Sequence, residues 1–438
     1  MSTDNLLDLA ALDGAAIPHD ARRYARFSLY DWMVCGVAGV DEPLSAILRG
    51  MMADEGGRPV ASVLGGGQVP ARAAALVNGA TSHALDYDDT HFAHVGHPSV
   101  GIYPAALAAG EEVGSSAAAV ADAFLIGAEA SVRVGLRLGA VHYNRGFHQT
   151  ATAGAFGATV AAGRLYGLTR AQMRVALGLC ATRASGLKSQ FGTMGKPYNA
   201  GIAASNGVEC AKLALGGFTS ADDGIDGAQG FVPTHSDAPV HSGVWDVLPP
   251  ARFLFTDIKY KLHACCHGTH AMIEALAAAQ RMQGFTAAQV ASVRLSTSSR
   301  WLQVCDIKKP RSGLEVKFSY AWLAGMVLSG IPTASDRAYT DALAGDDALA
   351  DFAGRVVVTG EARVGDMQAM GEVELQDGRV IPFAHDLDAP LPAAVLEQSL
   401  RSKAQGLIGP RGERLWSLVA GLDGVSARDL GQALRGKA

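Results

Sequence analysis

The chain has 438 residues, 49% of them hydrophobic, so it can bury large cores in more than one domain without disulfides or structural metals. Its 37 basic and 42 acidic residues give a net charge of −5, which argues against the basic surface needed to bind nucleic acid or an anionic membrane. We therefore expect a globular protein with neither of these partners.

The first residues and the cysteines bear on the compartment. The stretch MSTDNLLDLAALDG is acidic and lacks the regions of a secretory signal, and no window of about 18 residues is free of charged or polar groups. The cysteines show no CxxC spacing, which argues against a disulfide framework or an iron–sulfur cluster. We therefore expect a cytoplasmic protein in a reducing compartment.

Between residue 7 and about residue 262, apolar residues recur at helical spacing in segments rich in Ala, Gly and Leu. Because Ala and Gly let helix axes approach closely, we expect a compact multi-helix domain and not a sheet with crossover helices. The predicted helices include 71–85, 101–113, 116–138, 151–166, 170–185 and 198–216.

Residues 83–99, HALDYDDTHFAHVGHPS, concentrate carboxylates and imidazoles in an otherwise apolar sequence. The residues concerned are Asp86, Asp88, Asp89, His83, His91, His94 and His97. They cannot all be core residues, because unpaired charge is costly to bury and His titrates near neutral pH. Three interpretations stay open: a polar loop that lines a substrate pocket, which we favour, a metal site, and a solvated loop.

The metal interpretation depends on His91, His94 and His97, which are spaced three residues apart. On a helix this spacing spreads the side chains around the axis, and Gly96 and Pro98 argue against a helix here. The spacing therefore favours a polar loop that lines a substrate pocket over a metal site.

A second polar stretch, HYNRGFHQT at 142–150, carries Tyr143, Arg145 and His148 at the start of a small-residue helix. The N-terminal amides and the dipole of that helix would favour an anion. A surface loop with a helix cap is an equally good interpretation of this stretch taken alone.

A third stretch, KSQFGTMGKPYNAG at 188–201, places Lys188 and Lys196 in a Gly-rich bend before another helix. It resembles a phosphate-binding P-loop only loosely, because Gln190 and Pro197 stand where that loop has Gly and Ser or Thr. We therefore reject nucleotide binding.

A fourth stretch, KYKLHACCHGTHA at 259–271, lies where the helical region ends, and ligand sites favour such junctions. Its basic residues are Lys259, Lys261, His263, His267 and His270. Cys265 and Cys266 suggest a nucleophile, but the sequence fixes no base beside them, and buried cysteines are commonly inert.

Strand patterns begin after about residue 265 and predict a smaller α+β domain. The predicted strands are 289–297 and 354–361, with a hairpin over 370–382 around Asp377 and Gly378; the predicted helices are 271–283 and 315–329. The tail, 392–408 and 411–436, returns to helical periodicity, and we expect it to pack back onto the first domain.

Together these stretches resemble the MmgE/PrpD family in order and spacing. The shared motifs are HALDYDDT followed by HPS, then RGFH, then GTMGKP with NG downstream, then a Lys-rich segment ending in GTH, then KFS at 317–319. The resemblance implies a mainly α fold, in which 1–262 and 388–438 form an all-helical large domain and 263–387 a smaller α+β domain. It also implies a homodimeric, metal-free enzyme without a cofactor.

Members of this family include 2-methylcitrate dehydratase, cis-aconitate decarboxylase and iminodisuccinate epimerase. Carried over motif by motif, the resemblance nominates Asp86, Thr90, His97, His148, Lys196 and Lys261 as site residues. Two Lys and several His can neutralise the carboxylates of a small di- or tricarboxylate and stabilise an enolate. Asp86 would orient or charge a neighbouring His, and Thr90 would bind substrate.

Two departures from the family affect the pocket. Trp322 stands where the decarboxylase and the dehydratase have Tyr, and His263 stands where they have an aromatic residue and is a further candidate for substrate binding. The His spacing between 91 and 97 also differs by about one residue, so His94 is an alternative to His97.

The predicted reaction is proton abstraction beside a carboxylate, with His148 or His97 as base and with Lys196 and Lys261 holding carboxylates. Loss of a hydroxyl or of carbon dioxide would make the enzyme a hydro-lyase or a carboxy-lyase. Return of a proton to the opposite face, for which Tyr143 is the candidate acid, would make it an epimerase. A catalytically silent binding protein is the least favoured alternative.

Overall fold

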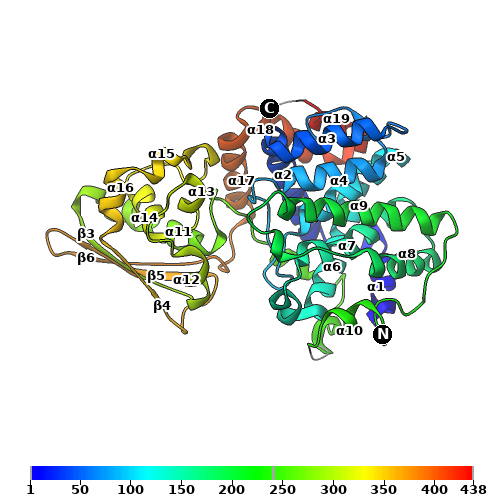
Figure 1. Cartoon of the computed structure of the whole chain (residues 1–438), viewed down its shortest axis with the longest axis horizontal. Helices are drawn as coiled ribbons and strands as arrows, with labels where there is room; N and C mark the ends of the chain where they lie inside the picture. The colour runs from blue at the N-terminus through cyan, green and yellow to red at the C-terminus, as the bar shows by residue number, and fades with distance from the viewer. Residues whose placement is uncertain (1, 239–241, 437–438) are drawn as a thin grey trace. The chain divides into compact units, whose positions relative to one another are not determined.

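The computed structural model describes residues 2–238 and 242–436 and is mainly helical (Figure 1). The chain divides into two compact units. Unit 1 contains Met1–Tyr260 and Ile408–Ala438, and unit 2 contains Lys261–Leu407. Among the described residues, no helix is long and apolar enough to cross a membrane.

Unit 1 is a helical body with one short hairpin. Its helices are α1 (Ser2–Ala10), α2 (His19–Ala38), α3 (Pro43–Glu55), α4 (Ala71–Ser82), α5 (Pro98–Val113), α6 (Ala117–Arg145), α7 (Gln149–Leu165), α8 (Arg170–Arg183), α9 (Gly195–Leu215), α10 (Phe231–His235), α18 (Arg411–Ala420) and α19 (Ala427–Leu434). The hairpin pairs β1 (Ala61–Ser62) with β2 (Gln68–Val69). Helices α4, α5, α6, α7 and α9 pack on one another and carry most of the buried small residues, as the composition predicts.

Two glycine contacts explain how these helices come so close. A Cβ atom added at Gly127 of α6 would lie 2.4 Å from the carbonyl oxygen of Gly157 in α7. One added at Gly79 of α4 would lie 2.8 Å from the Cα of Gly201 in α9. Real side chains cannot approach to these distances, so both crossings require glycine. The prediction of close-packed helices is confirmed.

The C-terminal helices pack back onto the N-terminal ones within unit 1, as predicted for 411–436. The Tyr30 hydroxyl on α2 donates to the Gly412 carbonyl at 3.2 Å, and Arg26 forms an ion pair with Asp423 at 2.8 Å. Helix α19 also packs against α5.

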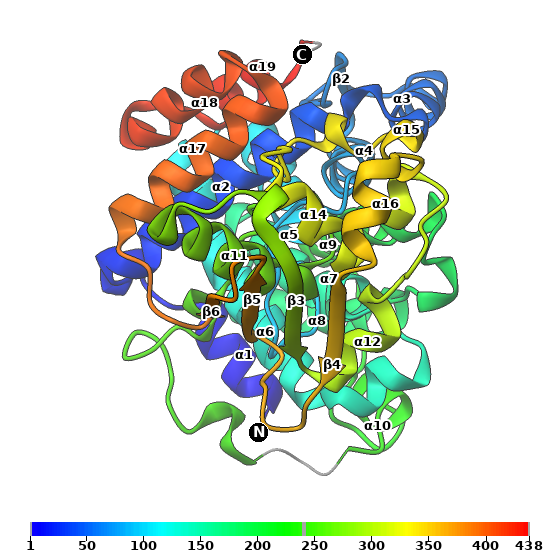
Figure 2. The same ribbon diagram turned by 90° about the vertical axis from the view of Figure 1, so that its left-hand side faces the viewer.

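Unit 2 contains a mixed four-stranded sheet in the order β4-β3-β5-β6 (Figure 2). Its strands are β3 (Val290–Thr297), β4 (Val356–Gly360), β5 (Gln368–Leu375) and β6 (Val380–Asp386). Strands β3 and β4 are parallel and the other pairs antiparallel. The predicted hairpin is the β5–β6 pair, whose turn uses Gly378 at a φ of 85°.

The helices of unit 2 are α11 (His270–Gln283), α12 (Ser299–Cys305), α13 (Gly313–Val316), α14 (Tyr320–Leu328), α15 (Asp341–Ala344), α16 (Asp347–Ala353) and α17 (Ala393–Ile408). Helix α11 packs on β5 and β6, and α14 packs on β4. Unit 2 therefore combines helices with one sheet. The sequence assigned 388–438 to the helical domain, whereas α17 is grouped with unit 2.

Candidate active site

The polar segment 83–97 is a loop between α4 and α5. Asp86 and Val95 have positive φ angles of 51° and 54°, so the backbone turns sharply twice within it. His97 stands directly before Pro98, the first residue of α5. A helical arrangement of the three spaced His residues is thereby excluded, as Gly96 and Pro98 predicted.

Five side chains of unit 1 form a continuous chain of polar contacts. Asp88 Oδ1 lies 2.8 Å from His83 Nδ1, and Asp88 Oδ2 lies 2.9 Å from His97 Nδ1. On the other side of the same ring, His97 Nε2 lies 3.4 Å from Asp86 Oδ1. Asp86 Oδ2 in turn accepts from Lys196 Nζ at 2.7 Å. The contact between Asp88 and His97 is close but poorly aligned, so it is mainly electrostatic.

His148 joins this group from the start of α7. Its backbone N–H donates to the Gly186 carbonyl at 3.0 Å, which holds the backbone of His148 at the N-terminus of the helix. Its Nδ1 lies 3.2 Å from Asn199 Nδ2, which is also 3.2 Å from the Leu187 carbonyl. The His148 ring stacks against His83 with centroids 6.1 Å apart.

Burial decides the charge of these groups. Burial would raise the pKa of Asp88, but the His83 and His97 imidazoles outweigh it and hold that pKa well below its usual range. Burial lowers the pKa of His83, and it lowers the pKa of His148 further still, with His83 and the Lys196 ammonium adding to the effect. At neutral pH the site therefore contains an ionised Asp88 and two neutral imidazoles.

The structure places His94 away from this group. Its ring is fully buried, with Nε2 2.8 Å from the Ser131 hydroxyl, and burial lowers its pKa to about 3. His97 is therefore the imidazole that meets the carboxylates, and His94 does not replace it.

Thr90 and Tyr143 have other neighbours. The backbone of Thr90 pairs with that of Lys259 through two hydrogen bonds of 2.8 Å. Tyr143 lies on α6, where Lys188 Nζ sits 3.6 Å from the centre of its ring and donates to its carbonyl at 3.1 Å.

Two models of known protein families match this chain. The model of the MmgE/PrpD N-terminal domain matches residues 9–242, and that of the MmgE/PrpD C-terminal domain matches residues 263–413. The chain belongs to the MmgE/PrpD family. Asp86, His97, His148 and Lys196, which the motifs of this family nominated, are thus neighbours in unit 1.

Several relatives carry the name of one activity. Cis-aconitate decarboxylase of Aspergillus terreus (strain NIH 2624 / FGSC A1156) is 30% identical over 339 residues, which are 71% of this chain and 68% of that protein. The cis-aconitate decarboxylase-like protein oryM of Aspergillus oryzae is 31% identical over 60% of this chain and 58% of its own length. Human cis-aconitate decarboxylase is 29% identical over 37% of this chain and 35% of its own length.

The remaining nominated residues belong to unit 2. Lys261 is 4% exposed. Both ring nitrogens of His263 are held within the unit, with Nδ1 2.8 Å from the Thr333 hydroxyl and Nε2 3.0 Å from Glu274, so its contacts are those of a structural residue. Trp322 is buried, and its Nε1 donates to a backbone carbonyl at 3.2 Å. That Lys261 and His263 bind substrate stays a prediction.

Sequence reasoning missed Asn199. It lies three residues after Lys196 on α9, and residues at that spacing share a helix face. This spacing, inside a motif that was already singled out, is the signal that could have found it. The part played by Asp88 also went unassigned, because only the folded loop shows which imidazoles it meets.

Donor atoms of His83, Asp86, Asp88 and His97 lie within 4.8 Å of one another, which is close enough to hold a metal ion. However, the Lys196 ammonium already lies 2.7 Å from Asp86, and a dication beside it would be repelled. The donor set alone is therefore compatible with a metal, whereas its charged surroundings disfavour one.

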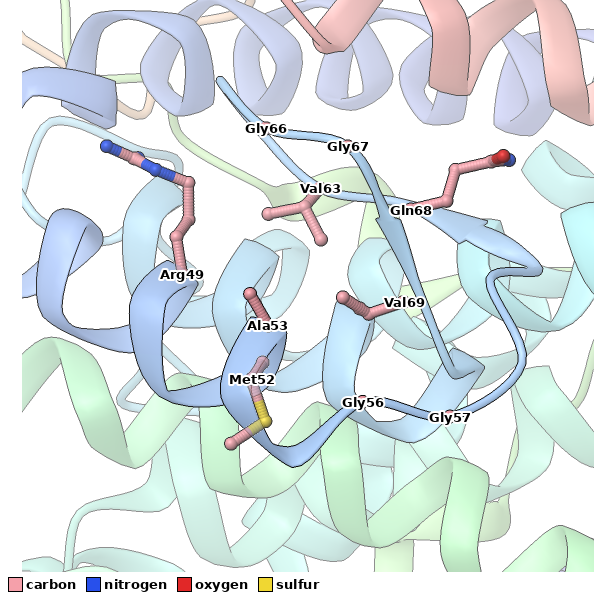
Figure 3. Close-up of a pocket in the computed structure, with 10 residues that line it drawn as sticks. All are labelled: Arg49, Met52, Ala53, Gly56, Gly57, Val63, Gly66, Gly67, Gln68 and Val69. Carbon is pink, nitrogen blue, oxygen red and sulfur yellow. The ribbon is translucent and has the colours of Figure 1, made fainter.

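A shallow pocket of about 280 Å³ lies elsewhere in unit 1, between α3 and the β1–β2 hairpin (Figure 3). Its lining includes Met52, Ala53, Val63 and Val69, and Arg49 is its one charged side chain. It holds none of the acids or imidazoles described above, so it offers no comparable chemistry.

Proposed function

We propose that the protein is a lyase that acts on a small di- or tricarboxylate at a carbon beside a carboxylate. The observation that carries the proposal is the chain of contacts from His83 through Asp88, His97 and Asp86 to Lys196, with His148 against it. It combines a cation for a carboxylate with imidazoles that can move a proton and stabilise an enolate.

Decarboxylation is the first candidate, because several relatives are named cis-aconitate decarboxylase. In this reaction the bond to one carboxylate breaks, carbon dioxide leaves, and the electron pair moves onto the remaining carboxylate as an enolate. The carbon then takes a proton, a step that we assign to His97 Nε2. Lys196 would hold a substrate carboxylate in place of its present contact with Asp86, whose side chain is 42% exposed.

Dehydration of a hydroxy acid uses the same groups in a different order: the proton leaves carbon first, and a hydroxyl follows. Epimerisation needs a second acid on the opposite face of the substrate, and Tyr143, its predicted donor, has Lys188 as its neighbour. We therefore keep epimerisation of an imino- or amino-dicarboxylate as the alternative. Deuterium incorporation at Cα without loss of a group would identify it.

The proposed enzyme needs no metal or cofactor, since Lys196 supplies the positive charge that a metal would bring. Dialysis against a chelator should leave turnover unchanged, and restoration of lost turnover by a divalent cation would contradict this part of the proposal. A homodimer and a cytoplasmic location stay predictions; light scattering of the purified protein tests the first.

A ligand screen tests the proposal most simply. A compound that binds only the native state raises the melting temperature, because it increases the free energy of unfolding by about 2.7 kcal/mol at a concentration of 100 times its Kd. Citrate, methylcitrate, aconitate, tartrate and iminodisuccinate form the panel. We expect at least one to stabilise the wild type and none to stabilise Lys196→Ala. Equal shifts in both proteins, or no shift in either, would contradict a polycarboxylate site at Lys196.

A further inference from the structure

The imidazoles of His97 and His148 have different polar neighbours. His97 meets a carboxylate at Nδ1, whereas His148 meets a side-chain amide at Nδ1. A carboxylate can only accept a hydrogen bond, and an amide can donate or accept according to its orientation. The tautomer of each ring is therefore set by its neighbour.

The orientation of Asn199 follows from its second contact. The same side-chain atom lies 3.2 Å from the Leu187 carbonyl, which can only accept a hydrogen bond. That atom must therefore be the NH₂ group, because a carbonyl oxygen there would face another oxygen. The NH₂ group has a second hydrogen, and it points at His148 Nδ1. Nδ1 must accept, so the ring proton of neutral His148 is on Nε2.

The corresponding argument for His97 gives the opposite result. Asp88 is buried and ionised, and its Oδ2 lies 2.9 Å from His97 Nδ1. The contact is poorly aligned for a hydrogen bond, but the negative charge of Oδ2 beside Nδ1 favours the tautomer with the proton on Nδ1. Nε2, which faces Asp86 at 3.4 Å, is left as the nitrogen that can gain or lose one.

We propose that Asp88 and Asn199 are positioning residues that divide the work between the two rings: His97 exchanges a proton with the substrate carbon through Nε2, and His148 donates a hydrogen bond from Nε2–H. This inference rests on the proposed function for its chemistry. It excludes His148 as the general base, one of the two options that the sequence left open.

The step balances without a further reactant. When carbon dioxide leaves, its bonding electron pair becomes the enolate, whose oxygen accepts the hydrogen bond from His148 Nε2–H. Before this, His97 takes a proton from solvent on Nε2; it gives that proton to the carbon and returns to the neutral form with its proton on Nδ1. Within the part of the chain that the structure describes, His148 Nε2 makes no hydrogen bond to protein, so it is available for this contact.

Nitrogen NMR of histidine-labelled protein tests the assignment without any substrate. The protein has 13 His, and loss of one signal in His97→Gln and in His148→Gln assigns the two rings. At pH 7 and in the free protein, we expect His148 to be neutral with its proton on Nε2 and His97 to carry a proton on Nδ1. A His148 ring that is charged or protonated on Nδ1 would overturn the proposal.

Kinetics of Asn199→Asp give the second readout, with Asn206→Asp as the matched control. Asn206 is buried on the same helix and donates to the Arg183 carbonyl at 2.8 Å, and it makes no hydrogen bond to an imidazole among the residues that the structure describes. Asn199→Asp replaces the donor by an acceptor, so it should move the His148 proton to Nδ1 and lower kcat by about 100-fold, with KM changed less than about three-fold.

Asn206→Asp should leave both the His148 signal and kcat near those of the wild type. An Asn199→Asp protein with unchanged kcat would overturn the proposal, as would an equal loss in both variants. If NMR gives the expected tautomers and no polycarboxylate is turned over, the proposed function fails while the tautomer assignment stands. If Asn199→Asp does not fold, the wild-type spectrum still decides the assignment.

Discussion

Replacing Lys196 by Met removes the cation that we place on a substrate carboxylate while keeping most of the side-chain volume. Lys196 Nζ already holds a carboxylate at 2.7 Å, and its side chain is only 16% exposed. Two unit charges 4 Å apart attract each other by about 4 kcal/mol at an effective dielectric constant of about 20. Because some solvent screens this side chain, we expect a loss of about 2–4 kcal/mol, or about 30- to 1,000-fold in kcat/KM.

The assay is release of carbon dioxide from cis-aconitate, or turnover of whichever polycarboxylate stabilises the protein in the ligand screen. Lys212→Met is the matched control, because Lys212 lies on the same helix, is 44% exposed and holds the Glu112 carboxylate at 2.8 Å. In this variant Glu112 keeps its contacts with Arg58 at 3.0 Å and with the Tyr166 hydroxyl at 2.6 Å, so the control should keep its activity.

Lys196→Met should also remain folded, because the Asp86 side chain that it leaves behind is 42% exposed and regains water. Its melting temperature should fall by no more than about 2–4 °C. A variant that is folded and retains kcat/KM within about three-fold of the wild type would show that Lys196 does not bind a substrate carboxylate.

Three further predictions concern the same unit. Asp88→Asn should lower kcat by about 10²- to 10⁴-fold at nearly constant KM, because its amide must donate to one of the two imidazoles and reverse that tautomer; steady-state kinetics measure this. Burial, reinforced by Asp31, raises the pKa of Asp89 to about 7. Between about pH 4 and pH 7 the Asp89 carboxyl is therefore protonated in the native state and ionised in the unfolded state, so the free energy of unfolding falls as the pH rises. Asp89→Asn removes this pH dependence, so its melting temperature should rise relative to that of the wild type as the pH rises from about 4 to about 7. A difference in melting temperature that stays constant over this range would contradict the assignment. Gly157→Ala should destabilise the protein by about 1–3 kcal/mol, whereas Gly154→Ala, whose added Cβ would meet its nearest neighbour at 3.8 Å, should not; urea unfolding compares the two.

Much of the architecture follows from periodicity. Segments such as 151–166 and 198–216 repeat apolar residues at helical spacing, and they form α7 and α9. The hairpin around Gly378 follows from its turn residues. The grouping of α17 with unit 2 could not be predicted, since its amphipathic pattern fits either unit.

The candidate site was harder to predict in detail. The chemistry of 83–99 is visible in the sequence, but the choice between His94 and His97 depends on the backbone turn at Val95, where φ is positive. That turn directs His94 into the core against Ser131 and leaves His97 to the carboxylates. Spacing along a loop does not reveal such a turn, because each residue in it has several allowed conformations.

The most direct test of the account is a single turnover experiment in D₂O with cis-aconitate, analysed by mass spectrometry. The account predicts that the wild type releases carbon dioxide and places one deuterium on the carbon of the product, and that His97→Gln does neither. A wild-type protein that returns cis-aconitate and the other polycarboxylates of the panel unchanged and unlabelled, although folded, would contradict the claim that this site catalyses proton transfer beside a carboxylate.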